Sequence, residues 1–308
     1  MKIGKIVTRG VRGVPDGAHD LTDPRTGEPH SLVFVTGPSA SGKTRLLESV
    51  MAAKEWVAPY GARPLASSWI RPGESAAKVT LGWRLSAEEQ AYGASGDASA
   101  ETESIFTHTG YSMPEEDGIV AVLRRYDHGH ETGKLEYFPA YRPVPATGIG
   151  VGLSPFEQRP LRASGEPRKF ASVTRVVHEI AGGGPTAEYF ADILSRLSPT
   201  CRFEPATSTD AFPRCFQGPG GPRSIRELSA SELDAVVLAA TAVMIGLSHS
   251  VVLIDTPELF VDPAFLPQLA EGLLALGQDV QVIAATRSPE MLRGAAPNQV
   301  ITLGGAPR

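Results

Sequence analysis

Cysteine is scarce in this sequence: Cys201 and Cys215 are the only two among 308 residues, and neither belongs to a C-x-x-C pair. A single pair in so long a chain excludes a disulfide-stapled fold, so we expect two free thiols in a reducing compartment. We also expect no secretory signal, because no apolar run follows the charged N-terminal segment. Together these absences predict a cytoplasmic protein.

An excess of basic charge is lacking as well. The net charge of -5 and the pI near 5.8 argue against a surface that coats phosphate backbones. The first thirteen residues nevertheless carry Lys2, Lys5, Arg9 and Arg12 and no acidic residue. We interpret these charges as the protection of an edge strand. A nucleic-acid contact is the alternative.

A membrane span is not expected either. The run Ala235–Ile254 is mostly apolar and has the length of a span, but Gly246, Ser248, His249 and Ser250 interrupt it. We therefore predict a buried helix followed by a buried parallel strand, and no membrane partner. No heptad pattern is long enough for a coiled-coil arm.

The sequence predicts an α/β fold. Strands and helices alternate in the last third of the chain, which favours a parallel sheet with right-handed crossovers. Predicted strands are Lys2–Thr8, Ser31–Thr36, Lys78–Trp83, Gly118–Tyr126, Lys134–Phe138, Val251–Ile254 and Val280–Ala285. Predicted helices are Lys43–Ala53, Lys169–Ile180, Thr186–Leu197, Ala230–Leu247 and Ala264–Leu276.

We predict one domain with two inserted lobes. The core would comprise residues 1–55 and 225–308, with a β-lobe at about 76–140 and a helical lobe at about 168–224. The three predicted strands between Lys78 and Phe138 are joined by polar loops, which favours antiparallel pairing. The loop Ser86–Glu103 is rich in Ala, Ser, Gly and Glu and is expected to be mobile.

A phosphate-binding motif follows the second predicted strand. It matches G-x-x-x-x-G-K-[ST] and consists of Gly37, Pro38, Ser39, Ala40, Ser41, Gly42, Lys43 and Thr44. Backbone N–H groups of such a loop hold phosphate oxygens, Lys43 would reach the β- and γ-phosphates, and Thr44 would ligate Mg²⁺. The alternative is a purely structural role, in which the loop is a glycine turn that caps a helix.

An aspartate and a capping-box motif complete this prediction. Asp255 ends the apolar strand Val251–Ile254, where a carboxylate could hold the magnesium shell; an ordinary strand-end aspartate is the alternative. Ser229 and Glu232 have the S-x-x-E spacing of a capping box, which by itself would explain both residues. A capped helix N-terminus is also an anion site.

The order of these motifs resembles the ABC-type P-loop ATPases of the RecF, SMC and OLD-like group. In that group a P-loop, inserted lobes, an L-S-x-G-E signature, a D-E-P-E run and T-H-S-P follow one another. Here the corresponding runs are Leu228–Glu232, Asp255–Glu258 and Thr286–Pro289. The likeness covers both ends of the chain, whereas about 55–222 agrees only in layout.

The resemblance implies a parallel core sheet and an ATP-sandwich dimer. In it, Ser229 would meet the γ-phosphate of a partner's nucleotide, and Asp262 would contact the opposite subunit. The partner would be a second copy or a related ATPase. The family's Q-loop glutamine has only a weak candidate, Gln158.

Three departures from the family pattern predict weak turnover. Thr256 stands where the group has its catalytic glutamate, and threonine cannot accept a proton at neutral pH. Arg287 stands where the group has its switch histidine, and a fixed cation could hold a γ-phosphate without shuttling a proton. Ser231 replaces the signature glycine. Glu258 could serve as a base in place of Thr256, or could simply orient the loop.

Our interpretation is an ATP- and Mg²⁺-binding switch with slow or partner-dependent hydrolysis, which controls a separate effector. Such small ATPases resemble regulatory subunits of bacterial anti-phage systems. The alternatives are a RecF-like DNA-repair ATPase with DNA as partner, and a non-hydrolysing scaffold in which ATP is structural. A nucleotide kinase and a transporter subunit fit the motif order less well.

Overall fold

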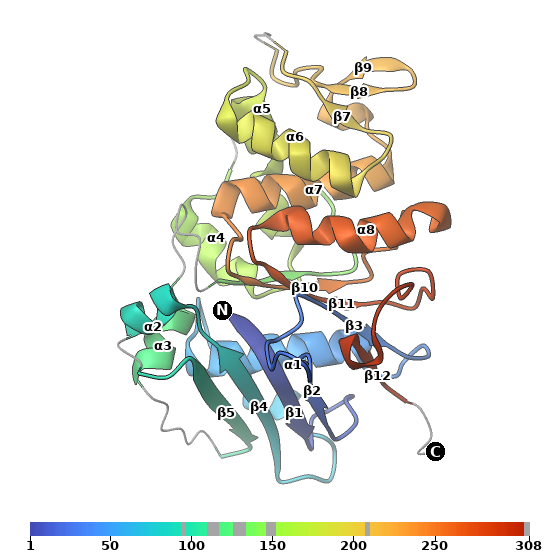
Figure 1. Cartoon of the computed structure of the whole chain (residues 1–308). Helices are drawn as coiled ribbons and strands as arrows, with labels where there is room; N and C mark the ends of the chain where they lie inside the picture. Colours follow the sequence, from blue (N-terminus) through green and yellow to red (C-terminus); the bar gives the residue numbers. More distant parts are fainter. Residues whose placement is uncertain (94–95, 110–116, 126–133, 146–151, 207–209, 305–308) are drawn as a thin grey trace.

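The computed structural model describes residues 1–93, 96–109, 117–125, 134–145, 152–206 and 210–304. Within these residues the strands form a central five-stranded sheet, an outer four-stranded sheet and a small three-stranded sheet. Figure 1 shows the outer sheet at one end of the molecule, the central sheet in the middle and the small sheet at the other end.

The central sheet is parallel, in the order β12-β3-β11-β10-β6. Both β10 and β11 are buried at every residue, as parallel strands covered on both faces should be. The predicted parallel α/β core is therefore confirmed. Its strands are β3 (Leu32–Thr36), β6 (Leu135–Phe138), β10 (Val251–Asp255), β11 (Gln281–Ala285) and β12 (Val300–Thr302).

Alternate residues of the central strands serve two separate cores. Val251 and Leu253 pack in a cluster with α1 (Lys43–Val57) and with residues of the outer sheet. Val252 and Ile254 pack in a second cluster with the helices on the opposite face. Helix α1, which follows the loop Gly37–Thr44, thus lies between the central sheet and the outer sheet (Figure 1).

The outer sheet is antiparallel, in the order β2-β1-β4-β5. It consists of β1 (Lys2–Arg9), β2 (Gly17–Asp20), β4 (Ala76–Arg84) and β5 (Ser99–Thr107). The predicted first strand is confirmed, but it lies in this sheet rather than in the core sheet. Two short helices, α2 (Ala87–Gly93) and α3 (Asp117–Arg124), lie beside it.

The other face of the central sheet carries helices and the small sheet. These elements are α5 (Val173–Ile180), α6 (Pro185–Leu197), α7 (Ala230–Ile245), α8 (Leu266–Gly272), β7 (Arg202–Phe203), β8 (Phe216–Gly218) and β9 (Gly221–Arg223). The short helix α4 (Pro155–Arg162) lies beside the edge strand β6, and its Arg159 donates to the carbonyl of Arg124 in α3. The apolar run Ala235–Ile254 divides at Gly246 into α7 and β10, as predicted. Among the described residues, no helix is long and apolar enough to cross a membrane.

Three predictions about the region after β4 are wrong. Gly118–Tyr126 is not a strand: its described part is α3, in which Ile119, Val122 and Leu123 are buried at helical spacing, and residue 126 lies outside the described residues. A short apolar run does not separate the two cases by periodicity. Lys134–Phe138 corresponds to β6, which pairs parallel with β10 rather than antiparallel in the lobe.

The third wrong prediction is the loop Ser86–Glu103. Its polar composition suggested a mobile loop, but it contains α2 and the start of β5, with residues 94–95 outside the described part. All nine residues of β5 pair with β4, so cross-strand hydrogen bonding outweighs local composition. The division into a core, a β-lobe and a helical lobe stays a prediction.

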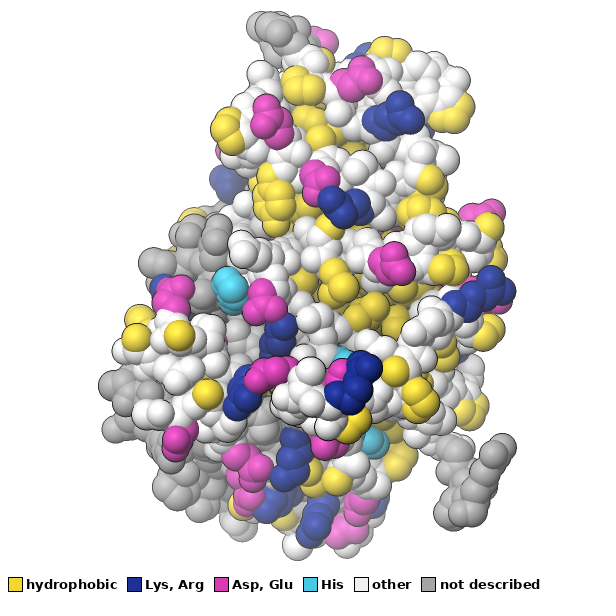
Figure 2. Space-filling model, viewed as in Figure 1, with side chains coloured by type: hydrophobic (Ala, Val, Ile, Leu, Met, Phe, Trp, Pro, Cys, Tyr) yellow, Lys and Arg dark blue, Asp and Glu magenta, His cyan; other side chains and the backbone are white. Residues whose placement is uncertain are grey.

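Two of the four basic residues of the N-terminal segment are paired with acidic residues. Lys2 forms an ion pair with Asp279, and Lys5 forms one with Glu101 of β5. On the face shown in Figure 2, blue and magenta side chains alternate over the outer sheet. This arrangement agrees with solvated, paired charges on a sheet.

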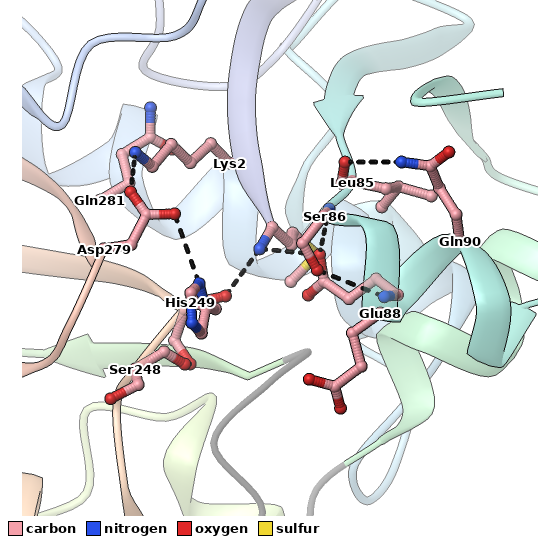
Figure 3. A network of polar contacts seen from close by, with 12 residues as sticks. Lys2, Leu85, Ser86, Glu88, Gln90, Ser248, His249, Asp279 and Gln281 are labelled. Carbon is pink, nitrogen blue, oxygen red and sulfur yellow. Dashed lines mark hydrogen bonds and ion pairs between the residues drawn. The ribbon is translucent and has the colours of Figure 1, made fainter.

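The two large sheets are joined at the start of β1 (Figure 3). Asp279 accepts a hydrogen bond from Lys2 and faces Nδ1 of His249 at 3.3 Å. Gln281, fully buried on β11, accepts a hydrogen bond from the backbone N–H of Ile3 at 2.6 Å and donates to the carbonyl of Ile3 at 2.9 Å. The side-chain amide of Gln281 thus bonds the backbone of Ile3 in β1 as the backbone of an adjacent strand would.

We expect Gln281→Ala to lower the free energy of unfolding by about 2–4 kcal/mol, because it leaves buried backbone groups of Ile3 without partners. Urea denaturation measures the change. The matched control is Gln278→Ala, three residues earlier and exposed, which should stay within about 0.5 kcal/mol of the unchanged protein. Equal effects of the two substitutions would contradict this role of Gln281.

Candidate nucleotide-binding site

The loop Gly37–Thr44 connects β3 to α1 through backbone that favours glycine. Gly37 has φ 145° and Gly42 has φ 98°. A Cβ atom at Gly42 would lie 2.3 Å from the carbonyl oxygen of Gly13, and one at Gly37 would lie 2.3 Å from that of Leu303. Only glycine fits at these two positions, so the loop's shape depends on them.

The N-terminus of α1 is open to a ligand. Gly42 occupies the N-cap position and supplies no side-chain hydrogen bond. The hydroxyl of Ser41 is buried, and it has no hydrogen-bond partner within the described residues. An uncapped helix N-terminus with an unpaired hydroxyl beside it suits an anion with several oxygens, such as phosphate.

Lys43 bends back over the loop. Its ammonium group donates to the carbonyl oxygens of Gly37 at 2.9 Å and Pro38 at 2.8 Å. The pKa of Lys43 is lowered, first by partial burial and then by the guanidinium of Arg287, while the nearby carboxylates of Asp255 and Glu258 act to raise it. A phosphate anion close to Lys43 would relieve this destabilisation of its charge.

Asp255 and Thr44 lie side by side, although 211 positions separate them in the sequence. Asp255 is 4% exposed at the end of β10, and its Oδ2 accepts a hydrogen bond from the Thr44 hydroxyl at 2.7 Å. Its Oδ1 accepts one from the Thr256 hydroxyl at 3.2 Å. Both oxygens of the carboxylate are therefore oriented before any ligand arrives.

Two of the three predicted catalytic positions, Glu258 and Arg287, meet at the edge of this loop. Glu258 Oε1 accepts a hydrogen bond from the backbone N–H of Arg287 at 2.9 Å. The guanidinium of Arg287 in turn donates to the Ser39 hydroxyl at 3.3 Å. Arg287 thus brings a second cation to the P-loop, and Glu258 holds the segment that carries it.

Thr256 has an uncommon backbone conformation. Its φ of 48° lies in the left-handed region, which is unfavourable for a β-branched residue. Its N–H bonds the carbonyl of Ala285 at 2.8 Å, so a neighbouring strand holds the turn in place. Strain of this kind is concentrated at functional sites.

Ser229 and Asp262 are not in hydrogen-bond contact with the P-loop. Within the described chain, the side chain of Ser229 takes part in a capping box with Glu232 and in a 3.3 Å contact with Ser231. Asp262 caps a short helical turn by accepting from the N–H of Ala264 at 2.8 Å. Both side chains are exposed.

Gln158 does not occupy a ligand-facing position. It is fully buried in α4, where its side chain bonds the carbonyl of Leu153, the hydroxyl of Ser172 and the guanidinium of Arg162. Sequence reasoning missed a different residue, Arg142, which lies just beyond β6 and bonds the carbonyl of Asp255 at 3.0 Å. Its place in a proline-rich segment gave no signal of this role.

The residues present fit a nucleoside triphosphate with Mg²⁺. Lys43, Arg287 and the N-terminus of α1 supply positive charge for phosphate oxygens. The hydroxyl of Thr44 and the carboxylate of Asp255 are hard oxygen ligands of the kind that Mg²⁺ takes. A magnesium ion bound there would neutralise charge on the phosphates.

Comparisons with known proteins agree with this fold. No family model and no curated protein matches the chain. Among solved structures, an SMC head bound to the C-winged helix domain of ScpA aligns with a TM-score of 0.55 at 14% identity, covering 98% of this chain and 94% of that one. The SMC head domain from Thermotoga maritima aligns with a TM-score of 0.54 at 15% identity, covering 95% and 92%.

A third SMC head domain carries an extended coiled coil and is bound to the C-terminal domain of ScpA derived from Pyrococcus furiosus. It aligns with a TM-score of 0.51 at 13% identity, covering 97% of this chain and 92% of that one. At these identities the likeness concerns the fold. The chain has the fold of SMC head domains, and the resemblance to ABC-type P-loop ATPases is thereby confirmed at the level of the fold.

Proposed function

We propose that this protein is an ATP-dependent switch that binds ATP with Mg²⁺ and pairs with a second such domain. The observation that carries the proposal is the hydrogen bond between Thr44 and Asp255, which joins the P-loop helix to the end of strand β10. Side chains held in this way need little rearrangement when a ligand binds, and preorganisation of this kind favours affinity.

In this proposal each side chain has a separate task. Lys43 and Arg287 bind the terminal phosphates, while Thr44 and Asp255 hold Mg²⁺. Ser229 and Asp262, both exposed and without bonds to their own P-loop, meet the nucleotide and the surface of a partner domain. The partner is a second copy or a related ATPase.

We further propose that the paired state controls a separate effector protein. Two of the similar SMC heads are bound to domains of another protein, ScpA, which supports a partner role for this fold. A place in anti-phage defence rests on the family resemblance alone. The RecF-like alternative would be favoured by salt-sensitive binding to duplex DNA.

Slow hydrolysis follows from the residue at position 256. We expect Thr256→Glu to raise the steady-state rate of phosphate release at least about tenfold, because a missing general base costs roughly 10²–10⁴ in rate. A glutamate would also leave the left-handed turn without a β-branched side chain. Phosphate release from saturating Mg-ATP measures the effect.

The matched control is Glu258→Gln. Glutamine keeps an oxygen that can accept from the N–H of Arg287 but cannot act as a base, so the slow rate of the unchanged protein should persist. Fast turnover by the unchanged protein that Glu258→Gln abolishes would overturn the proposal and identify Glu258 as the base.

A further inference from the structure

Arg142 is a buried guanidinium that joins three segments of the chain. It is 3% exposed and lies four residues beyond the end of β6. Its Nη1 donates to the carbonyl oxygens of Pro139 at 2.6 Å and Asp255 at 3.0 Å. Its other two nitrogens donate to Asp234 in α7, Nε to Oδ1 at 2.6 Å and Nη2 to Oδ2 at 2.7 Å.

The ion pair between Arg142 and Asp234 fixes the relative position of the two segments that carry these residues. Asp234 is 6% exposed, so two charges have been removed from water. A buried ion pair is weak evidence for stability, because desolvation offsets much of the attraction. A planar, two-point contact does fix the relative position of the groups that it joins, and a lysine could not reproduce it.

One of the groups that Arg142 contacts, the carbonyl of Asp255, belongs to the candidate magnesium site. The carbonyl that accepts from Arg142 is that of Asp255, whose carboxylate accepts from Thr44. Arg142 therefore contacts the backbone of the residue that would sense the metal and nucleotide. Among the described residues, its side chain bonds Asp234, Pro139 and Asp255 and forms no hydrogen bond with the P-loop, so Arg142 is a positioning residue.

The other group belongs to the helix that carries Ser229. Asp234 lies five residues after Ser229, within the first turns of the continuous helix α7. Between them Glu232 accepts from the N–H of Ser229 at 2.9 Å and is itself held by two bonds from Arg223, at 2.7 and 2.9 Å. These bonds hold the first residues of α7 in a fixed arrangement, so a displacement of Asp234 would also displace Ser229.

We propose that Arg142 couples ligand binding at Asp255 to the position of Ser229, and so to pairing of two domains. The inference rests on the pairing proposed above. When ATP and Mg²⁺ bind, a displacement of Asp255 at the end of β10 would move its carbonyl oxygen and with it the guanidinium of Arg142. Arg142 would then displace Asp234 and the N-terminal part of α7. Binding at one site then changes the free energy of association at the other.

A role of Arg142 in stability alone predicts a different result. If Arg142 only held α7 against the sheet, its removal would lower stability and leave the linkage between ATP and pairing intact. The quantity that separates the two is the ratio of the dimerisation constants with and without ATP. A direct test needs a variant that keeps the fold but lacks the bridge.

The test variant is Arg142→Met with Asp234→Leu. Replacing both partners of a buried ion pair by apolar residues of similar size avoids the unpaired buried charge that the removal of one partner leaves. The carbonyls of Pro139 and Asp255 still lose the bond from Arg142, so thermal unfolding checks that the variant is folded. Sedimentation velocity gives the dimerisation constants with and without Mg-ATP. Calorimetry in a Ser229→Arg background, in which pairing is blocked, gives ATP affinity of the single domain.

We expect the double variant to bind ATP within about threefold of the unchanged protein. Its ATP-induced gain in dimerisation should fall by roughly 5–150-fold, the usual range of such couplings. If the double variant does not fold, Arg142→Lys serves instead, because it keeps the charge but loses the two-point contact. An undiminished gain in the folded variant would overturn the coupling.

The matched control is Lys169→Met. Lys169 is also a fully buried cation beside β6, paired with Glu136 at 2.9 Å and bonded to the carbonyl of Tyr137. The described residues show no bond from Lys169 to Asp255 or α7. Its loss should change stability but not the ATP-induced gain, and an equal loss of the gain would overturn a specific role for Arg142. Absence of ATP-linked pairing in the unchanged protein would instead refute the proposed function itself.

Discussion

Lys43→Ala should weaken ATP binding at least about 100-fold, because charge-assisted hydrogen bonds to phosphate are lost and each is worth about 1.5–3 kcal/mol. In the free protein this ammonium bonds only two loop carbonyls, those of Gly37 and Pro38, among the described residues. The fold should persist, since the side chain is partly exposed and its two bonds are both to carbonyls of its own loop. Calorimetric titration with Mg-ATP measures the affinity, and thermal unfolding checks the fold.

The control for Lys43→Ala is Lys5→Ala. Lys5 pairs with Glu101 on the outer sheet, where both side chains are about half exposed, and it takes no part in the P-loop. Its removal should leave ATP affinity within about twofold, since exposed pairs contribute little. Unchanged ATP affinity in a folded Lys43→Ala protein would contradict the assignment of the loop Gly37–Thr44 to phosphate binding.

Much of the core could be predicted from the sequence. Continuous burial of Val251–Ile254 and the glycine-framed loop at Gly37–Thr44 are encoded locally, in apolar runs and in residues that tolerate unusual backbone. Because strand ends of a parallel sheet share one edge, the closeness of Thr44 and Asp255 was also predictable. The structure places these two side chains 2.7 Å apart.

The middle of the chain could not be predicted in this way. Glu136 in β6 is a fully buried acid, and a polar residue in a strand suggests an exposed face until its buried partner Lys169 is known. That ion pair, like the pairing of β5 with β4, depends on tertiary contacts rather than on local pattern. Arg142 belongs to the same class, because its partners lie 92 and 113 positions away.

Ser229→Arg should abolish ATP-linked pairing while sparing ATP binding. The Ser229 side chain is exposed at the N-terminus of α7, and in the proposed dimer it lies against a partner's nucleotide. A long cationic side chain at that point would obstruct the contact. Loss of the helix cap should cost about 1 kcal/mol of folding stability, too little to unfold the domain.

The matched control for that variant is Ser154→Arg. Ser154 forms the same kind of capping box, with Glu157, at the exposed N-terminus of α4. It therefore loses an equivalent cap and gains the same charge at another helix. The two variants should lose similar stability, but pairing should fail in Ser229→Arg alone. Equal pairing in both would mean that Ser229 serves its helix cap and nothing more.

The most direct measurement of the central claim is sedimentation velocity of the unchanged protein without nucleotide, with Mg-ADP and with Mg-ATP. A ligand that binds the paired state better must raise its population, and only ATP carries the γ-phosphate that Ser229 would contact. We expect a dimer that becomes dominant with ATP and stays minor in the other two conditions. A dimer population that is the same in all three conditions would contradict it.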